Sequence, residues 1–162
     1  MQNALTALHV LISLAGIATG VVVAVGLLRG RRLDGWTAAF LITTVLTSVT
    51  GFVFFPFHKL LPSHVVGAVS LVVLALAFYA RYPGGMRGAW RRTYVINAMI
   101  ALYLNVFVLI AQAFLKVPAL NSLAPTGAET PFKVAQLVVL TFFVVLGTRA
   151  AMKFREDSAR RG

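Results

Sequence analysis

The chain has 162 residues, of which 59% are hydrophobic and only 12% are charged, and its mean hydropathy is +0.87. Soluble domains carry about 25% charged and about 45–50% apolar residues, so this composition predicts an integral membrane protein without a separate soluble domain. Because the chain has no cysteine, disulfides, thiol redox chemistry, iron–sulfur clusters and cysteine-bound zinc are excluded.

Five apolar runs are each long enough to cross the hydrocarbon core of a bilayer, which needs about 20 helical residues. We therefore predict an all-α fold, an integral membrane bundle of five transmembrane helices that forms one domain over residues 1–162. The predicted helices cover, in chain order, residues 5–28, 36–57, 62–82, 93–115 and 131–152. Asp34 and Thr130 precede the second and fifth of these runs, where each side chain is suited to cap a helix N-terminus.

The first predicted helix carries a stripe of small and polar residues on one face. His9, Ser13, Gly16 and Gly20 recur at intervals of four, three and four residues, a spacing that places them on one side of a helix. Gly16 and Gly20 form a pair of small residues four apart, which lets another helix approach closely. We expect this face to pack against a partner helix.

The connection between the second and third predicted helices, FFPFHKLLPSHVVG over residues 54–67, contains two of the three histidines. His58 follows a stripe of Thr44, Thr47 and Gly51 on the second helix, and His64 lies near the start of the third. Since successive helices of a bundle alternate in direction, His9, His58 and His64 are predicted to share one end, each at the head of an inward-facing stripe.

The last two predicted helices add amides. Asn105 and Gln112 are seven residues apart on the fourth helix, and Gln136 lies on the fifth. An unpaired amide that faces lipid costs several kcal/mol, so all three side chains are expected to point into the bundle. The apolar connection over residues 116–132 is predicted to fold back as a lid over His9 and His64, and Glu129 to form a capping box with Thr126.

The basic residues fall on alternate connections, twelve on one set and three on the other. The larger set is Arg29, Arg31, Arg32, Arg81, Arg87, Arg91, Arg92, Arg149, Lys153, Arg155, Arg160 and Arg161, and the smaller is Lys59, Lys116 and Lys133. Cytoplasmic loops of membrane proteins carry the excess of Lys and Arg, which predicts an outside N-terminus and a cytoplasmic C-terminus. The net charge of +11 is then explained by topology and by contact with anionic lipid, without nucleic acid.

Three interpretations of the histidine-rich end remain open. In the first, the polar groups only bond helix to helix, as in a structural or accessory subunit of a membrane complex. In the second, they orient a small apolar ligand, such as a lipid or a quinone, in an outer-leaflet pocket. In the third, which is the least favoured, His9, His58 and His64 bind b-type haem or a metal ion.

Enzymatic activity is not favoured by the distribution of acidic residues. No Asp or Glu lies within any of the five predicted spans, where a proton relay needs one. Glu129 is the only acid at the predicted outer side, too few for a hydrolytic triad with an orienting acid.

From Thr43 to about Gly147 the chain resembles small bacterial inner-membrane proteins that have no assigned activity. The resemblance is carried by the stretches TSVTGFVFFPF, PSHVVGAVSLVVLALAFYA, YLNVFVLIAQAF and KVPALNSLAPTGAETPFKVAQL. It implies a multi-pass fold in a bacterial inner membrane, and it lends no catalytic residues.

Overall fold

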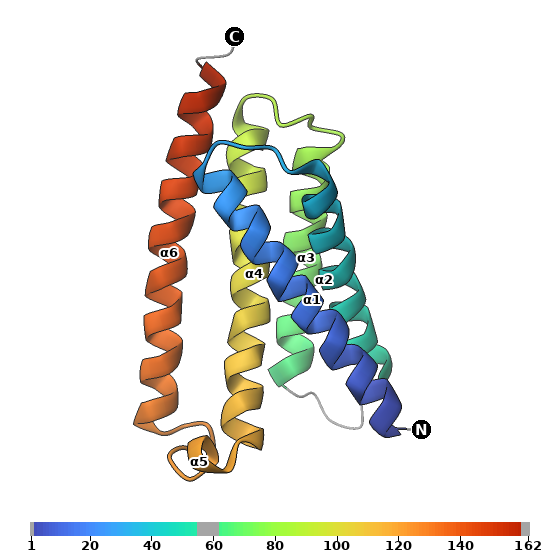
Figure 1. The fold of residues 1–162 in the computed structure, drawn as a ribbon, viewed down its shortest axis with the longest axis vertical. Helices are drawn as coiled ribbons and strands as arrows, with labels where there is room; N and C mark the ends of the chain where they lie inside the picture. The colour runs from blue at the N-terminus through green and yellow to red at the C-terminus, as the bar shows by residue number, and fades with distance from the viewer. Residues whose placement is uncertain (1, 55–61, 160–162) are drawn as a thin grey trace.

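The computed structural model of the chain describes residues 2–54 and 62–159, and in these two ranges it contains helices and no strand (Figure 1). The helices are α1 (Gln2–Leu28), α2 (Asp34–Phe54), α3 (Pro62–Arg81), α4 (Ala89–Lys116), α5 (Pro118–Asn121) and α6 (Thr130–Ala159). All of them except the short α5 contain a segment long and apolar enough to cross a membrane. The predicted all-α bundle with five such helices is confirmed.

The long helices run up and down, so the bundle has two chemically different ends. We call the end where α1 and α3 finish and α2 and α4 begin the arginine end, because the described loops there carry residues such as Arg29, Arg31 and Arg87. The opposite end, where α1 and α3 begin, holds His9 and His64 and is called the histidine end. The arginine end is at the top of Figure 1 and the histidine end at the bottom.

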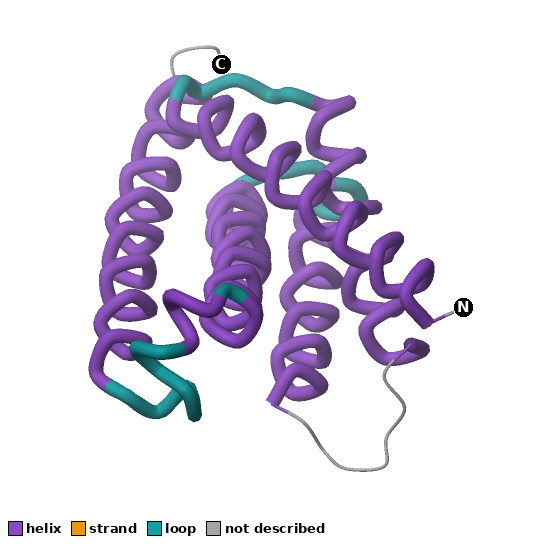
Figure 2. The backbone as a smooth tube through the Cα atoms, turned by 60° about the horizontal axis from the view of Figure 1, so that its bottom comes forward, coloured by secondary structure: helices purple, strands orange, loops and turns teal. Residues whose placement is uncertain are grey.

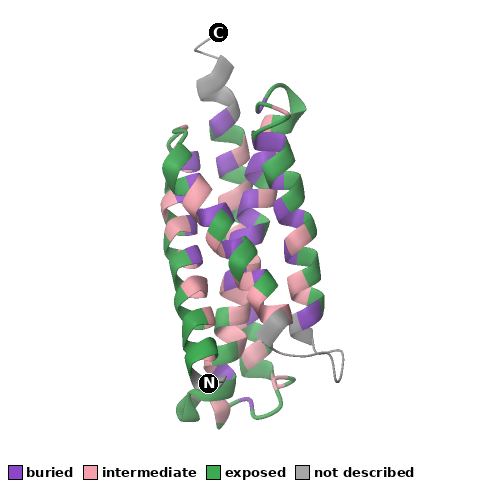
Figure 3. Cartoon of the chain, turned by 90° about the vertical axis from the view of Figure 1, so that its right-hand side faces the viewer, coloured by how far each residue is buried: buried purple, intermediate pink, exposed green. Residues whose placement is uncertain are grey.

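Helix α4 is the centre of the packing, since it contacts α1, α3 and α6, while α2 packs against α1 and α3. The dry core lies in the arginine half. Its members come from the late parts of α1, α3 and α6 and the early parts of α2 and α4, and include Leu27, Phe40, Leu74, Tyr94 and Leu102. Figure 3 shows the same gradient, with buried segments concentrated toward the arginine end. The histidine half is therefore packed less densely.

The glycine pair of α1 explains how closely the helices approach. A Cβ atom on Gly20 would lie 2.6 Å from Leu102 Cδ1 and 2.8 Å from Phe40 Cε2, and one on Gly16 would lie 3.4 Å from Thr44 Oγ1. The predicted partner of the Gly16–Gly20 face thus belongs to the same chain: α1 packs against α2 and α4 through these glycines.

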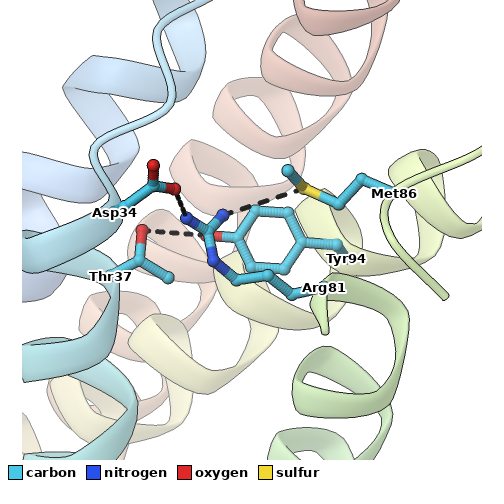
Figure 4. Close-up of polar contacts among 5 residues, drawn as sticks. All are labelled: Asp34, Thr37, Arg81, Met86 and Tyr94. Carbon is cyan, nitrogen blue, oxygen red and sulfur yellow. Dashed lines mark hydrogen bonds and ion pairs between the residues drawn. The ribbon is translucent and has the colours of Figure 1, made fainter. Parts of the chain in front are cut away.

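A buried arginine ties three helices together at the arginine end (Figure 4). Arg81, the last residue of α3, forms an ion pair with Asp34, the first residue of α2, and its guanidinium carbon lies 5.0 Å from the centre of the Tyr94 ring on α4. The Tyr94 hydroxyl lies 3.2 Å from Thr37 Oγ1, and Arg81 Nη1 lies 3.7 Å from Met86 Sδ. These contacts stabilise the arginine end of the bundle.

Candidate functional site

A cavity of about 490 Å³ lies in the histidine half between α1, α2, α3 and α4. Pockets that bind small molecules measure about 300–1,000 Å³ and combine apolar walls with a few polar groups. The residues that line this one are Thr6, His9, Val10, Ser13, Leu14, Ile17, Thr47, Ser48, Gly51, Phe52, His64, Val66, Gly67, Ser70, Leu104, Asn105, Val108, Leu109, Gln112, Ala113 and Lys116.

The cavity exists because small side chains stand where larger ones would fill the space. Ser13 on α1, Gly51 on α2 and Ser70 on α3 all line it. On α3, Gly67 makes room for the ring of Phe52, because a Cβ atom there would lie 3.0 Å from Phe52 Cε2. The small residues of the predicted stripes thus create space as well as close packing.

A hydrogen bond joins His9 to α2. His9 Nδ1 lies 2.8 Å from Thr50 Oγ1, and the same hydroxyl also lies 2.7 Å from the carbonyl oxygen of Leu46. The bond holds the imidazole in place at the cavity wall.

His64 forms a second wall in the first turn of α3. Its side chain is buried, and its ring stacks nearly parallel to that of Phe52, with centroids 5.8 Å apart and an interplanar angle of 14°. Phe52 belongs to α2, so this pair joins the two helices at the edge of the cavity. His9 and His64, two of the three histidines that the sequence places at this end, thus line one cavity.

Asn105 forms the floor of the cavity and is buried. Its Nδ2 group donates to Thr44 Oγ1 on α2 at 3.1 Å, and a Cβ atom on Gly16 would lie 3.5 Å from the same nitrogen. Close beside it, Ser48 Oγ donates to the carbonyl oxygen of Thr44 at 3.0 Å. These bonds fix the floor where α1, α2 and α4 meet, at the boundary with the dry core.

Gln112 and Lys116 extend the face of Asn105 toward the end of α4. Both side chains are exposed, and both line the cavity. No acidic residue is found among the described lining residues, so Lys116 leaves the mouth electropositive. The sequence analysis missed Lys116 as a site residue, although its spacing of four residues from Gln112 and eleven from Asn105 continues the same helical face.

The exposed part of the lining shows where the cavity opens. Val10 and Leu14 of α1 and Leu109 of α4 line it and are 40%, 45% and 42% exposed. The opening therefore lies between α1 and α4, on the apolar side wall of the bundle. An apolar molecule would enter sideways from the lipid.

Two of the predicted site residues are not part of the described cavity. Gln136 lies between α6 and α4, where Nε2 donates to the carbonyl oxygen of Phe107 at 3.1 Å and Oε1 is buried without a hydrogen-bond partner. It misses the cavity because α6 packs on a different face of α4 from the one that carries Asn105. His58 lies outside the residues that the structure describes.

The predicted lid over residues 116–132 is wrong, because Lys116, which ends α4, is the only residue of this segment that lines the cavity. Helix α5 instead packs against the end of α4 (Figure 2), where Asn121 Nδ2 donates to the carbonyl oxygen of Phe114 at 3.2 Å. The rings of Phe114 and Phe132 meet edge to face at 5.4 Å. The segment covers the end of the α4 and α6 pair and leaves the mouth of the cavity open.

Metal ligands are sparse in the part of the chain that the structure describes, where no group of three or more His, Cys, Asp or Glu side chains is placed to hold an ion. No protein-family model, curated protein or solved structure matches the chain. The five apolar helices make it a multi-pass membrane protein.

Proposed function

We propose that this chain is a multi-pass protein of the bacterial inner membrane that binds one small, largely apolar molecule, a lipid or a quinone, in the cavity at its histidine end. The proposal rests on four polar side chains that come from three helices and line one space among apolar side chains. They are His9, His64, Asn105 and Gln112. His9 and Asn105 also bond to α2, through Thr50 and Thr44, but helix-to-helix bonds alone do not require a cavity beside them.

The arrangement of polar groups supports a ligand with a polar head and an apolar body. Asn105 lies at the floor, while Gln112 and Lys116 supply N–H donors at the mouth, where a carbonyl, hydroxyl or phosphate oxygen would be bound. Between these levels the walls are apolar, with residues such as Ile17 and Val108. The opening between α1 and α4 suits a molecule that is dissolved in the bilayer.

The charge distribution supports an orientation for the site. The loops of the arginine end and the helix ends that adjoin them hold most of the basic residues, and the positive-inside rule places such an end in the cytoplasm. The cavity then opens to the outer leaflet. The resemblance of residues 43–147 to small bacterial inner-membrane proteins supports the choice of membrane.

Ligand binding is tested by mass spectrometry of small molecules extracted from the detergent-purified protein. We expect the wild-type protein to retain a lipid or quinone and Ser13→Phe to retain little or none, because the new ring fills the cavity. Ala18→Phe is the matched control, since Ala18 is exposed and does not line the cavity. Equal retention by the wild-type protein and Ser13→Phe would contradict the proposal.

The role of the mouth amide is tested separately with decylubiquinone added to the ligand-free protein. Gln112→Leu should weaken binding about fivefold, the loss expected for one hydrogen bond. Gln136→Leu changes the same kind of side chain outside the cavity and should leave binding unchanged. An absorbance band in the Soret region of the freshly purified protein would instead show that the cavity holds haem.

A further inference from the structure

A second elongated space lies on the other side of α4, in the arginine half. It is a groove of about 550 Å³ between α4 and α6, separate from the cavity described above. Its lining residues are Arg92, Ile96, Met99, Ile100, Tyr103, Leu140, Phe143, Val144, Gly147, Thr148, Ala151 and Met152. We propose that this groove binds one acyl chain of an anionic phospholipid, whose phosphate is held by Arg92.

The length of the groove matches one leaflet. Along α4 it extends from Arg92 to Tyr103, which at 1.5 Å per residue is about 16 Å. The hydrocarbon core of a bilayer is about 30 Å thick, so half of it is about 15 Å. The groove therefore reaches from the membrane surface to about the midplane, as one acyl chain does.

The depth of the groove comes from a missing side chain. A Cβ atom on Gly147 would lie 3.6 Å from Met99 Cβ, and Met99 is itself buried. Thus at this point α6 has no side chain between the groove and α4, and Met99 forms the floor. Apolar side chains such as Ile100 and Val144, both exposed, stand at the sides.

The charge at one end selects the head group. Arg92 is exposed, lies at the surface end of the groove, and has no carboxylate within ion-pair distance among the described side chains. A guanidinium binds phosphate oxygens through two parallel N–H bonds. None of the described residues that line the groove is acidic, so the head group of an anionic lipid is attracted to Arg92 while its acyl chain contacts apolar side chains.

The same charge argues against a second copy of the chain as the occupant. All copies share one orientation in a membrane, so a dimer formed through this groove would bring two arginine ends together. Arg92 would then face the basic end of its partner, and like charges repel. A phosphate removes that repulsion, which favours the lipid.

Native mass spectrometry of the detergent-purified protein tests the site with two added lipids, palmitoyl-oleoyl phosphatidylglycerol and the zwitterionic phosphatidylcholine with the same chains. The wild-type protein should retain the anionic lipid in preference. Arg92→Gln should lower its retention about fivefold, the effect of one basic group near a membrane surface, and should leave phosphatidylcholine unchanged. Gly147→Leu should reduce retention of both lipids, because it fills the groove.

Arg29→Gln is the matched control, because it removes an exposed charge at the same end, from the loop between α1 and α2. It should behave as the wild-type protein does. Equal losses in Arg92→Gln and Arg29→Gln would overturn the proposal, since the effect would then belong to the overall surface charge. Unchanged selectivity in Arg92→Gln would also overturn it, as would a wild-type dimer that Gly147→Leu converts to a monomer.

Discussion

Arg81 and Asp34 differ sharply in their surroundings, although they form one ion pair. The Arg81 side chain is 5% exposed and that of Asp34 is 81% exposed. Removing the carboxylate would therefore leave a buried cation with fewer partners, whereas removing the guanidinium would leave an anion that water solvates. Removing Asp34 should therefore lower the stability of the protein more than removing Arg81.

We expect Asp34→Asn to lower the free energy of unfolding by about 1–3 kcal/mol, the penalty for a buried donor that loses its acceptor. In an Arg81→Met background the same change should cost less than about 1 kcal/mol, which is the size of a helix-terminus charge effect. The measurement is a double-mutant cycle of unfolding by SDS in mixed micelles. Equal costs in both backgrounds would mean that the pair contributes nothing to stability.

Gly20 is the tightest contact between α1 and its neighbours. Gly20→Ala should lower the free energy of unfolding by about 1–3 kcal/mol, the usual cost of overpacking, because the new Cβ atom would overlap Leu102 and Phe40. Gly35→Ala is the control, since nothing lies within 4 Å of its Cβ position. That change should stabilise the protein by at most about 1 kcal/mol through helix propensity, and a loss of similar size at both positions would refute the packing argument.

Among single residues, the sequence predicted His9, His64, Asn105 and Gln112 as site residues, and the structure places all four at one cavity. Helical spacing sufficed, because each residue heads or continues a stripe that must face inward. Gln136 satisfies the same rule and lies elsewhere. The rule says that a polar residue faces the bundle, but which neighbouring helix it meets depends on tertiary packing.

At the scale of elements, hydropathy predicted the positions of all five spans, but it predicted the ends of the helices less accurately. Helix α6 continues to Ala159, seven residues past its predicted end at 152, because the polar residues beyond the apolar run, such as Lys153 and Arg155, are good helix formers in water. The short α5 was not predicted, since one turn leaves no periodic pattern. The prediction of the lid failed for a related reason. The apolar composition of the segment indicated that it is buried, but it did not indicate which helices it packs against.

The turn before α6 is stabilised by the Glu129 carboxylate, and it forms only half of the predicted capping box, because the Thr126 hydroxyl accepts from the N–H group of Ala128 and not from that of Glu129. The Thr126 hydroxyl donates to Glu129 Oε1 at 2.8 Å, and the backbone N–H groups of Thr126 and Ala128 donate to the same carboxylate at 3.1 and 3.0 Å. These bonds, that of the Thr126 hydroxyl first, hold the pKa of Glu129 below its ordinary value. The carboxylate is therefore ionised more readily in the folded turn than in the unfolded chain.

It follows that the turn has its full stability above the ordinary pKa of Glu and loses it as the pH falls through the lowered folded pKa. Hydrogen exchange at the Ala128 amide should accelerate, relative to the intrinsic rate, between about pH 6 and about pH 3. Glu129→Gln should remove this pH dependence. If the wild-type amide kept constant protection over the whole range, the carboxylate would have no part in the turn.

At the scale of the molecule, the two halves of the bundle differ in how they are packed. The arginine half holds the dry core and the Arg81 contacts, while the histidine half holds the cavity. Destabilising changes should thus be tolerated better around the cavity than around Tyr94. If the charge at the arginine end orients the protein in the membrane, it also decides which leaflet the cavity opens to.

Orientation is tested by single cysteines, which the cysteine-free chain allows without other changes. In intact cells, a membrane-impermeant maleimide should label Ser122→Cys, in the exposed turn after α5, and should not label Ala89→Cys, at the exposed start of α4. Labelling of both after permeabilisation controls for reactivity. The opposite pattern in intact cells would place the cavity in the cytoplasmic leaflet.

The central position of α4 also bears on how the protein is made. Asn105 is 61 residues after Thr44, its partner, so at about 5–20 residues per second the ribosome needs about 3–12 seconds to supply it. Until then α1 and α2 have only each other to pack against, through α1's glycines, with no α4 to close the floor between them. We expect nascent chains whose part outside the ribosome ends before residue 89 to form cysteine cross-links between α1 and α2, and those whose part outside the ribosome extends past residue 116 to add links to α4. If the shorter chains do not cross-link, α1 and α2 do not pack against each other before α4 is inserted. The translocon would then have to keep them separate until α4 is available.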